Sequence, residues 1–265
     1  FYQARQEKIE KLLNDSSRKL TEEQKSYWLD MNSKVEEPFQ YGYYKSWETI
    51  ISCFELLMFS LLAVCIVIAP VFSGEYQAGT DAVILSAKYG KTKLTTAKIV
   101  ASYLFGFAAF TLHIIVAFGL PLVAFGVDGW NLPLQINGTT VPYPLTFLQG
   151  TLVNLGVIYL VLFAMISLTL LLSAKMKSPY LVLIVLVPVL FIPLFVSPNG
   201  TTGLYNLILF LLPYHSTVPQ FGQYISYQFG SLVLDIFSVR AILYATLTVI
   251  MLPLAKRFFK QHQVA

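Results

Sequence analysis

Long apolar segments fill most of the chain after residue 50. Five of them are long enough to predict membrane-spanning helices, at about 50–72, 99–125, 145–173, 180–196 and 232–255. A helix needs roughly 17–25 mostly apolar residues to cross the hydrocarbon core of a bilayer. It also satisfies its own backbone hydrogen bonds, which lipid cannot do. The sequence therefore predicts an all-α fold, a polytopic membrane helix bundle with five spans in this chain.

Charged residues are scarce and unevenly placed. They make up 12% of the chain, which is about half the share in a typical soluble domain. Residues 1–50 hold eight of the 18 Lys and Arg and nine of the 14 Asp and Glu. The rest of the chain has too few charges to cover a water-exposed surface, whereas a surface in lipid requires none. The net charge of +4 needs no nucleic-acid partner to explain it, because the basic residues lie where membrane topology favours them.

Basic residues predict the orientation of the spans. Lys and Arg follow the first, third and fifth apolar segments, and the connections after the second and fourth contain none. The positive-inside rule places the basic connections in the cytoplasm. Residues 1–49 are then expected outside, as a helical loop or small ectodomain, and the C-terminus is expected in the cytoplasm. We also expect one further span before residue 1, which would give six spans with both ends in the cytoplasm.

Two connections between the apolar segments predict short structural elements of their own. The cytoplasmic segment 73–96 contains a stretch, 75–85, that predicts a short helix lying on the membrane surface, and a basic turn follows it. The segment 204–230 begins with an apolar run that is too short to cross a membrane. Two prolines interrupt it, Pro213 and Pro219. We expect a short re-entrant or interfacial hairpin there, before the last span.

The sequence contains no pattern typical of a catalytic or metal site. It lacks the phosphate loop G-x-x-x-x-G-K-[ST], and it lacks H-E-x-x-H and G-x-S-x-G. Cys53 and Cys65 would lie roughly 18 Å apart on one helix, which is too far for a disulfide. His113 lies at membrane depth, where an interhelical hydrogen bond is the expected role. We therefore predict no catalytic, cofactor-binding or metal-binding residue in this chain.

The connection between the first two apolar segments carries a longer pattern, within residues 72–99. It consists of Glu75, Gly79-Thr80, Leu85-Ser86, a basic turn from Lys88 to Lys93, and Ala97-Lys98-Ile99. This pattern, together with the layout of the spans along the chain, resembles the ABC type-2 permease family. Many members have Pro and Arg at the positions of Ala87 and Lys91, so the subfamily, and with it the substrate, stays open.

The resemblance implies a role for this connection and a set of partners. In that family it is the coupling helix, which docks on a separate ATP-binding-cassette ATPase subunit that holds ATP and Mg²⁺. The implied coupling residues are Glu75, Tyr76, Gln77, Gly79 and Thr80. A second permease subunit, identical or related, would complete a dimer. Residues 50–265 would form the permease domain, surrounded by lipid in the plasma membrane of a bacterium.

Three functions fit these observations. The first is the permease subunit of an ATP-driven exporter, which is not itself an enzyme. The second is a non-transporting membrane immunity or sensor protein that binds a peptide through its extracellular loop. The third is an intramembrane enzyme, for which the chain offers the least support. Peptide, drug and lipid exporters share this layout, so the sequence does not select a substrate.

Two charges are predicted inside the outer halves of spans. Glu55 would lie roughly 27 Å, and Arg240 roughly 24 Å, above the cytoplasmic ends of their helices. Because an isolated charge at membrane depth is costly, we hypothesise an ion pair between them, within one subunit or across a dimer, that opens during export. Two alternatives remain: each side chain reaches outside water separately, or Asp235 pairs with Arg240 at a poor i, i+5 spacing.

Overall fold

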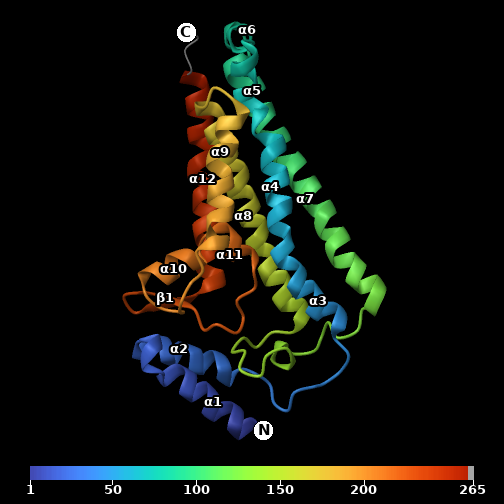
Figure 1. Ribbon diagram of the computed structural model, residues 1–265, viewed down its shortest axis with the longest axis vertical. Coiled ribbons are helices and arrows are strands. Elements are labelled where there is room, and N and C mark those ends of the chain that lie inside the picture. Colours follow the sequence, from blue (N-terminus) through green and yellow to red (C-terminus); the bar gives the residue numbers. More distant parts are fainter. Residues whose placement is uncertain (262–265) are drawn as a thin grey trace. The chain divides into compact units, whose positions relative to one another are not determined.

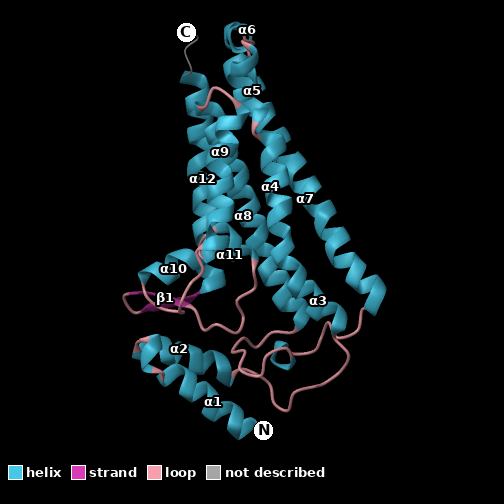
Figure 2. Ribbon diagram, in the orientation of Figure 1, coloured by secondary structure: helices cyan, strands magenta, loops and turns pink. Residues whose placement is uncertain are grey.

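Helices account for most of the chain (Figures 1 and 2). The structure is a computed structural model that describes residues 1–261, with the side chain of Leu85 excepted. The last four residues of the expected permease domain, 262–265, lie outside the described residues. The α-helices are α1 (Tyr2–Asn14), α2 (Glu22–Ser33), α3 (Lys45–Cys53), α4 (Leu57–Ile68), α5 (Pro70–Ala78), α6 (Asp81–Ser86), α7 (Thr95–Phe125), α8 (Phe147–Lys175), α9 (Pro179–Phe195), α10 (Leu204–Phe210), α11 (Pro213–Thr217) and α12 (Ile236–Gln261). Shorter turns of helix are η1 (Ser16–Arg18), η2 (Phe54–Leu56), the π-helical η3 (Gly90–Leu94) and η4 (Leu134–Ile136).

Within residues 1–261, four helical stretches are long and apolar enough to cross a membrane. They are Lys45–Ala78, Gly90–Phe125, Phe147–Lys175 and Ile236–Gln261. The prediction of a multi-span helical membrane protein is confirmed at this level. The expected span 180–196 corresponds to α9, which is apolar but has only 17 residues. By length and composition the described residues contain four candidate spans, and a fifth crossing by α9 stays a prediction.

The first candidate span continues past its expected end at residue 72. The helices α3 to α5 follow one another closely, so the helical stretch reaches Ala78. Pro70 is tolerated because it stands at the start of α5, where its missing N–H costs little. The prediction of one short surface helix over 75–85 is wrong, because Gly79 separates α5 from α6. Glu75 therefore belongs to the last turns of this span.

A small antiparallel sheet replaces the expected helical start of the last span. Strand β1 (Ser226–Phe229) pairs with β2 (Leu232–Asp235). Gly230 in the turn has a φ of +63°, a conformation that favours glycine. Helix α12 begins directly after Asp235, whose Oδ1 accepts a hydrogen bond from the backbone N–H of Ser238 as a helix cap does. The all-α prediction holds for most of the chain and is wrong for this hairpin.

The expected hairpin at 204–230 contains two short helices and the first strand. Pro213 separates α10 from α11 by standing at the first position of α11, and this break agrees with the prediction. Pro219 follows α11 and precedes β1 without starting a helix. The segment is thus folded into short elements.

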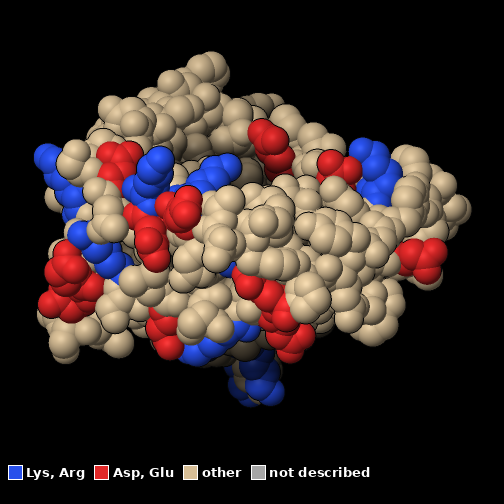
Figure 3. Space-filling model, turned by 90° about the horizontal axis from the view of Figure 1, so that it is seen from below, with Lys and Arg blue, Asp and Glu red and all other residues tan. Residues whose placement is uncertain are grey.

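Three segments distant in the sequence form one compact unit, which we call unit 1. They are Phe1–Glu55, Ala117–Val157 and Val196–Arg240. Residues 1–49, expected as an ectodomain, therefore fold together with two later segments. Acidic and basic side chains are interspersed on the face of the molecule that Figure 3 shows.

The core of unit 1 is aromatic. Trp28 in α2 is fully buried, and its rings lie edge-on to those of Tyr143 and Tyr224. Its indole Nε1 donates to Oγ of Ser226 in β1 at 3.2 Å. A buried indole N–H needs such a partner, so this contact fixes α2 against the hairpin.

The second unit, unit 2, consists of Leu56–Val116, Ile158–Phe195 and the described part of Ala241–Ala265. Its helices pack closely. A Cβ atom on Gly106 of α7 would lie 2.5 Å from Cδ1 of Ile166 in α8 and 3.1 Å from Cγ1 of Val64 in α4. Hydroxyl pairs add to this packing, as between Thr111 and Tyr159 at 2.7 Å. Small residues and polar side chains are typical of helix contacts in membranes.

Candidate functional site

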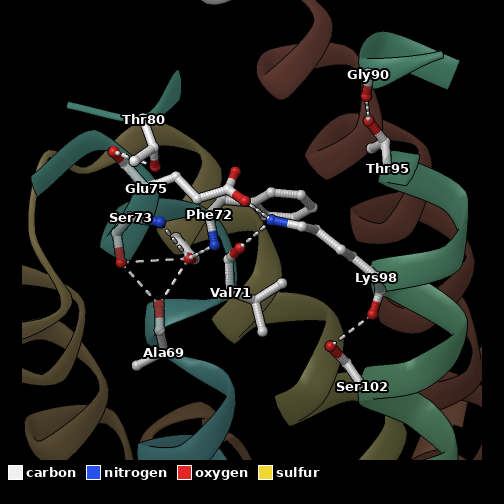
Figure 4. Close-up of polar contacts among 11 residues, drawn as sticks. Ala69, Val71, Phe72, Ser73, Glu75, Thr80, Gly90, Thr95, Lys98 and Ser102 are labelled. Carbon is white, nitrogen blue, oxygen red and sulfur yellow. Dashed lines mark hydrogen bonds and ion pairs between the residues drawn. The ribbon is translucent and has the colours of Figure 1, made fainter. Parts of the chain in front are cut away.

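The last turns of the first candidate span are tied to α7 by an ion pair (Figure 4). Oε1 of Glu75 in α5 contacts Nζ of Lys98 in α7. The same ammonium donates to the carbonyl oxygen of Val71 at 3.0 Å and lies 5.7 Å from the centre of the Phe72 ring. The two charged side chains are only 15% and 21% exposed. Such shielding from water strengthens the attraction between opposite charges.

The carboxylate of Glu75 keeps one oxygen free. Its Oε2 is buried and has no hydrogen-bond partner among the described residues. A buried carboxylate oxygen without a partner is costly, so this part of α5 is able to accept one more donor.

A serine from another helix caps the start of α5. Pro70 lacks an N–H, and the next N–H groups need acceptors, as at any helix start. Oγ of Ser173 in α8 accepts hydrogen bonds from the backbone N–H groups of Phe72 and Ser73, both at 3.0 Å. The same hydroxyl donates to the carbonyl oxygen of Ala69 at 2.6 Å. One hydroxyl thus fixes α5 against α8.

Gly79 ends α5 in the left-handed conformation, with a φ of +67°. Its N–H donates to the carbonyl of Tyr76, and the N–H of Thr80 donates to that of Glu75, at 3.2 and 3.1 Å. This is the pattern of a Schellman motif, which glycine favours. A Cβ atom on Gly79 would meet no described atom within 4 Å. Glycine is therefore required for its conformation and not for close packing within this chain.

Beyond Gly79, the short helix α6 presents an exposed surface. The side chain of Val83 is 73% exposed, and Ala82 and Ser86 are also exposed. On its other side α6 lies against Gly90, where a Cβ atom would lie only 1.7 Å from the carbonyl oxygen of Ile84. Helix α6 is thus closely packed on one side and exposed to solvent on the other.

The five predicted coupling residues divide between these two environments. Three are exposed, namely Gln77, Gly79 and Thr80. Glu75 and Tyr76 are directed into unit 2, where Oη of Tyr76 donates to the carbonyl of Ala174 in α8 at 3.2 Å. Two of the five are thus anchors within this chain, and three are accessible to a partner.

Two residues of this site were not predicted. The sequence pattern contains Lys98 without assigning it a role, although a lysine just inside an apolar span is itself a signal, since its charge needs a partner there. Ser173 carries a weaker signal, because serine is common in membrane helices. Neither partner is evident from spacing along the chain.

The hypothesised pair of Glu55 and Arg240 has other contacts. Oε1 of Glu55 accepts a hydrogen bond from Oη of Tyr214 in α11 at 2.6 Å, and this bond, with a smaller effect of burial, raises the pKa of Tyr214 to about 12. Arg240 is fully buried and donates to backbone carbonyl oxygens of Phe210, His215 and Val218. Both charges thus contact the 204–230 segment through different residues, and a direct pair stays a prediction.

Nothing in the described part of the chain brings together three or more His, Cys, Asp or Glu side chains that could hold a metal ion. Comparison of the chain with protein-family models, curated proteins and solved structures gave no match.

Proposed function

We propose that this chain is the membrane-spanning permease subunit of an ATP-binding-cassette exporter. It forms the translocation path with a second permease subunit, identical or related. ATP, with Mg²⁺, is bound and hydrolysed by a separate ATPase subunit, as the family resemblance implies. The coupling element is the segment from Glu75 to the exposed helix α6.

The observation that carries this proposal is an exposed helix attached to an anchored one. Val83 and Thr80 are open to a partner, while α5 directly before them is held by Glu75 and by the Ser173 cap. A docking element that transmits force needs both properties.

Movement of the ATPase subunit reaches the spans through these anchors. A displacement of α6 acts on α5, and α5 is joined to α7 by the Glu75–Lys98 pair and to α8 by the Ser173 hydroxyl. Packed helices that shift as rigid bodies are one of the common forms of conformational switching. Closure of the ATPase pair on ATP would therefore tilt several spans together.

The distribution of charge agrees with the division of the chain into two units. The connections without Lys or Arg, 126–144 and 197–231, lie within unit 1 together with residues 1–49. The basic segments 73–96, 174–178 and 256–260 all lie within unit 2. This division supports the orientation that the positive-inside rule gives, with α6 in the cytoplasm.

Single-cysteine labelling tests this orientation. In a background with Cys53 and Cys65 replaced by alanine, a membrane-impermeant maleimide added to intact cells should label cysteine at Ser33, Gly138 or Gly200. It should label cysteine at Ser86 or Ser178 only after the cells are opened. Labelling of the Ser86 variant in intact cells would reverse the orientation and exclude α6 as a cytoplasmic coupling element.

Site-specific crosslinking tests the partner. A photoreactive residue at Thr80 or Val83, introduced in the native host, should crosslink to a protein with a phosphate loop, and the same residue at Ser33 should not. The purified complex should hydrolyse ATP in a vanadate-sensitive manner. A membrane preparation of active protein that gives neither crosslink nor ATP hydrolysis would refute the proposal.

One observation favours the alternative, a peptide-binding immunity or sensor protein. Unit 1 contains a hollow of about 350 Å³ between residues 34–40 and 131–149. Its walls offer both hydrogen-bonding and apolar side chains, among them Lys34, Phe39, Gln135 and Gln149. Immunity or peptide sensing that persists after deletion of the ATPase gene would support this alternative over the exporter.

A further inference from the structure

Three lysines from two candidate spans line one hollow in unit 2. Its volume is about 500 Å³. The walls are formed by Thr92, Lys93, Thr96, Ala97, Val100, Lys256 and Lys260. The first five residues belong to η3 and the start of α7, and the last two belong to the end of α12. The hollow therefore lies where the Gly90–Phe125 and Ile236–Gln261 stretches have their termini.

The residues of each helix that line the hollow share one face. Lys93, Thr96, Ala97 and Val100 follow the spacing i, i+3, i+4, i+7, and Lys256 and Lys260 follow i, i+4. Residues at these spacings lie above one another on a helix. One face of α7 with η3 and one face of α12 thus line the same hollow. Both faces carry lysine, and the first also carries threonine hydroxyls.

The wall of the hollow is mostly apolar, and the positive charge that its three lysines bring is not neutralised by an ion pair within the described chain. No Asp or Glu is among its lining residues. The ion pairs formed within residues 1–261 do not include Lys93, Lys256 or Lys260. Nζ of Lys93 instead lies 4.7 Å from the centre of the Tyr89 ring. Three like charges around one hollow favour a ligand with negative charge.

The hollow changes from charged to apolar along α7. Lys93 and Val100 are seven residues apart, which is roughly 10 Å along a helix. Val100 is 50% exposed, and Leu104, one turn further into the span, is 65% exposed. A ligand that fits this gradient has an anionic group at one end and hydrocarbon at the other. Free phosphate would use only the charged end.

We propose that this hollow binds the headgroup of an anionic glycerophospholipid. The phosphate lies among the ammonium groups of Lys93, Lys256 and Lys260, and the hydroxyls of Thr92 and Thr96 donate to its oxygens. The acyl chains follow the exposed apolar face of α7 beyond Val100. Basic pockets between membrane helices recognise anionic headgroups by the same physical terms. This inference does not depend on the proposed transport function.

Native mass spectrometry of the purified chain tests the site, with phosphatidylglycerol and phosphatidylcholine of identical acyl chains as probes. The variant is the triple substitution Lys93→Gln, Lys256→Gln and Lys260→Gln. The matched control is Lys88→Gln, Lys91→Gln and Lys177→Gln, which removes the same charge from exposed lysines outside the hollow. A separate variant, Ala97→Trp, fills the hollow and keeps every charge.

The wild type and the control should retain phosphatidylglycerol at least about fivefold more than phosphatidylcholine, a ratio that corresponds to about 1 kcal/mol. The triple variant and Ala97→Trp should each lose this preference while they elute as folded protein in size-exclusion chromatography. Equal retention of the two lipids by the wild type, or an unchanged preference in both variants, would overturn the proposal. Full displacement of the lipid by millimolar glycerol phosphate would also overturn it, because the site would then recognise a free phosphate.

Discussion

Arg240 in α12 donates from Nη2 to the carbonyl oxygen of His215 at 2.7 Å, and its side chain is fully buried. The same nitrogen donates to the carbonyl of Phe210 at 2.9 Å, and Nη1 donates to that of Val218 at 3.3 Å. Phe210 is the last residue of α10, and the final carbonyls of a helix have no partner within it. One guanidinium therefore holds α10, α11 and the following loop together.

Replacement of Arg240 by leucine should destabilise unit 1. The carbonyl oxygens that it binds would lose their donors, and each buried carbonyl left alone costs about 1–3 kcal/mol. Arg240→Lys should be intermediate, because an ammonium cannot reproduce the planar fork of the guanidinium. Thermal unfolding in detergent measures both effects. Arg257→Leu, an exposed arginine near the end of the same helix, is the control and should leave the unfolding temperature unchanged; an equally stable Arg240→Leu would contradict the clamp.

The Glu55–Tyr214 hydrogen bond should make stability depend on pH in the alkaline range. The pKa of Tyr214 is raised from 10.0 to about 12, first by its bond to Glu55. Because the folded state holds this proton more tightly than the unfolded state, the stabilisation is present below pH 10 and is lost as the pH rises through about 12. Tyr214→Phe should remove that component, so the difference in stability between wild type and variant should shrink over this range. A constant difference would show that Tyr214 does not titrate there.

A charge swap tests the direct pair of Glu55 and Arg240. Glu55→Arg and Arg240→Glu should each impair folding. Recovery in the double variant would support a contact, within the subunit or across a dimer. Losses that simply add would exclude it.

The sequence predicts the spans better than it predicts their ends. Apolar segments over 99–125 and 145–173 become helices, because lipid leaves the backbone no other way to satisfy its hydrogen bonds. The apolar run Leu232–Asp235 predicts the start of a helix, because a short apolar run has the same appearance in a helix and in a strand. Its pairing with Ser226–Phe229 depends on a turn at Gly230 and on unit 1 as a whole.

The candidate site was only partly predictable, because its anchors come from other helices. The sequence indicated Glu75 and Gly79, but Lys98 lies on α7 and Ser173 on α8. Which helices pack together follows from the fold and not from spacing along the chain. The acceptors of Arg240 are backbone carbonyls, and no pattern of side chains reveals them.

The ion pair of Glu75 and Lys98 should show energetic coupling. Lys98→Met leaves a shielded carboxylate without its cation, and we expect a loss of about 1.5–3 kcal/mol in the free energy of unfolding. Glu75→Gln should cost less, since an amide can still accept from Lys98. The double variant Glu75→Leu, Lys98→Met should lose less than the sum of the two corresponding single variants. Additivity in this cycle would mean that the two side chains do not interact in solution.

The cap that Ser173 provides should be measurable on its own. Ser173→Ala removes the acceptor of two N–H groups at the start of α5, and loss of a helix cap costs about 0.5–2 kcal/mol. Ser52→Ala is the matched control, because the hydroxyl of Ser52 bonds only within its own helix, to the carbonyl of Glu48. Hydrogen exchange should then rise at Phe72 and Ser73 in the Ser173 variant alone. Equal exchange in the two variants would show that Ser173 does not cap α5 in solution.

Two substitutions of Gly79 distinguish the effect of this residue on stability from its proposed role in transport. Gly79→Leu forces a side chain into a φ of +67°, which costs about 1–2 kcal/mol or redirects α6. Gly79→Asn keeps the left-handed conformation at a smaller cost, because asparagine adopts it more readily. Both variants should insert in the membrane, and ATP-dependent export should fall strongly in Gly79→Leu while Gly79→Asn keeps most of it. Wild-type export by both variants would show that the turn between α5 and α6 does not transmit movement, and equal loss by both would point to contact of a partner with the bare glycine backbone instead.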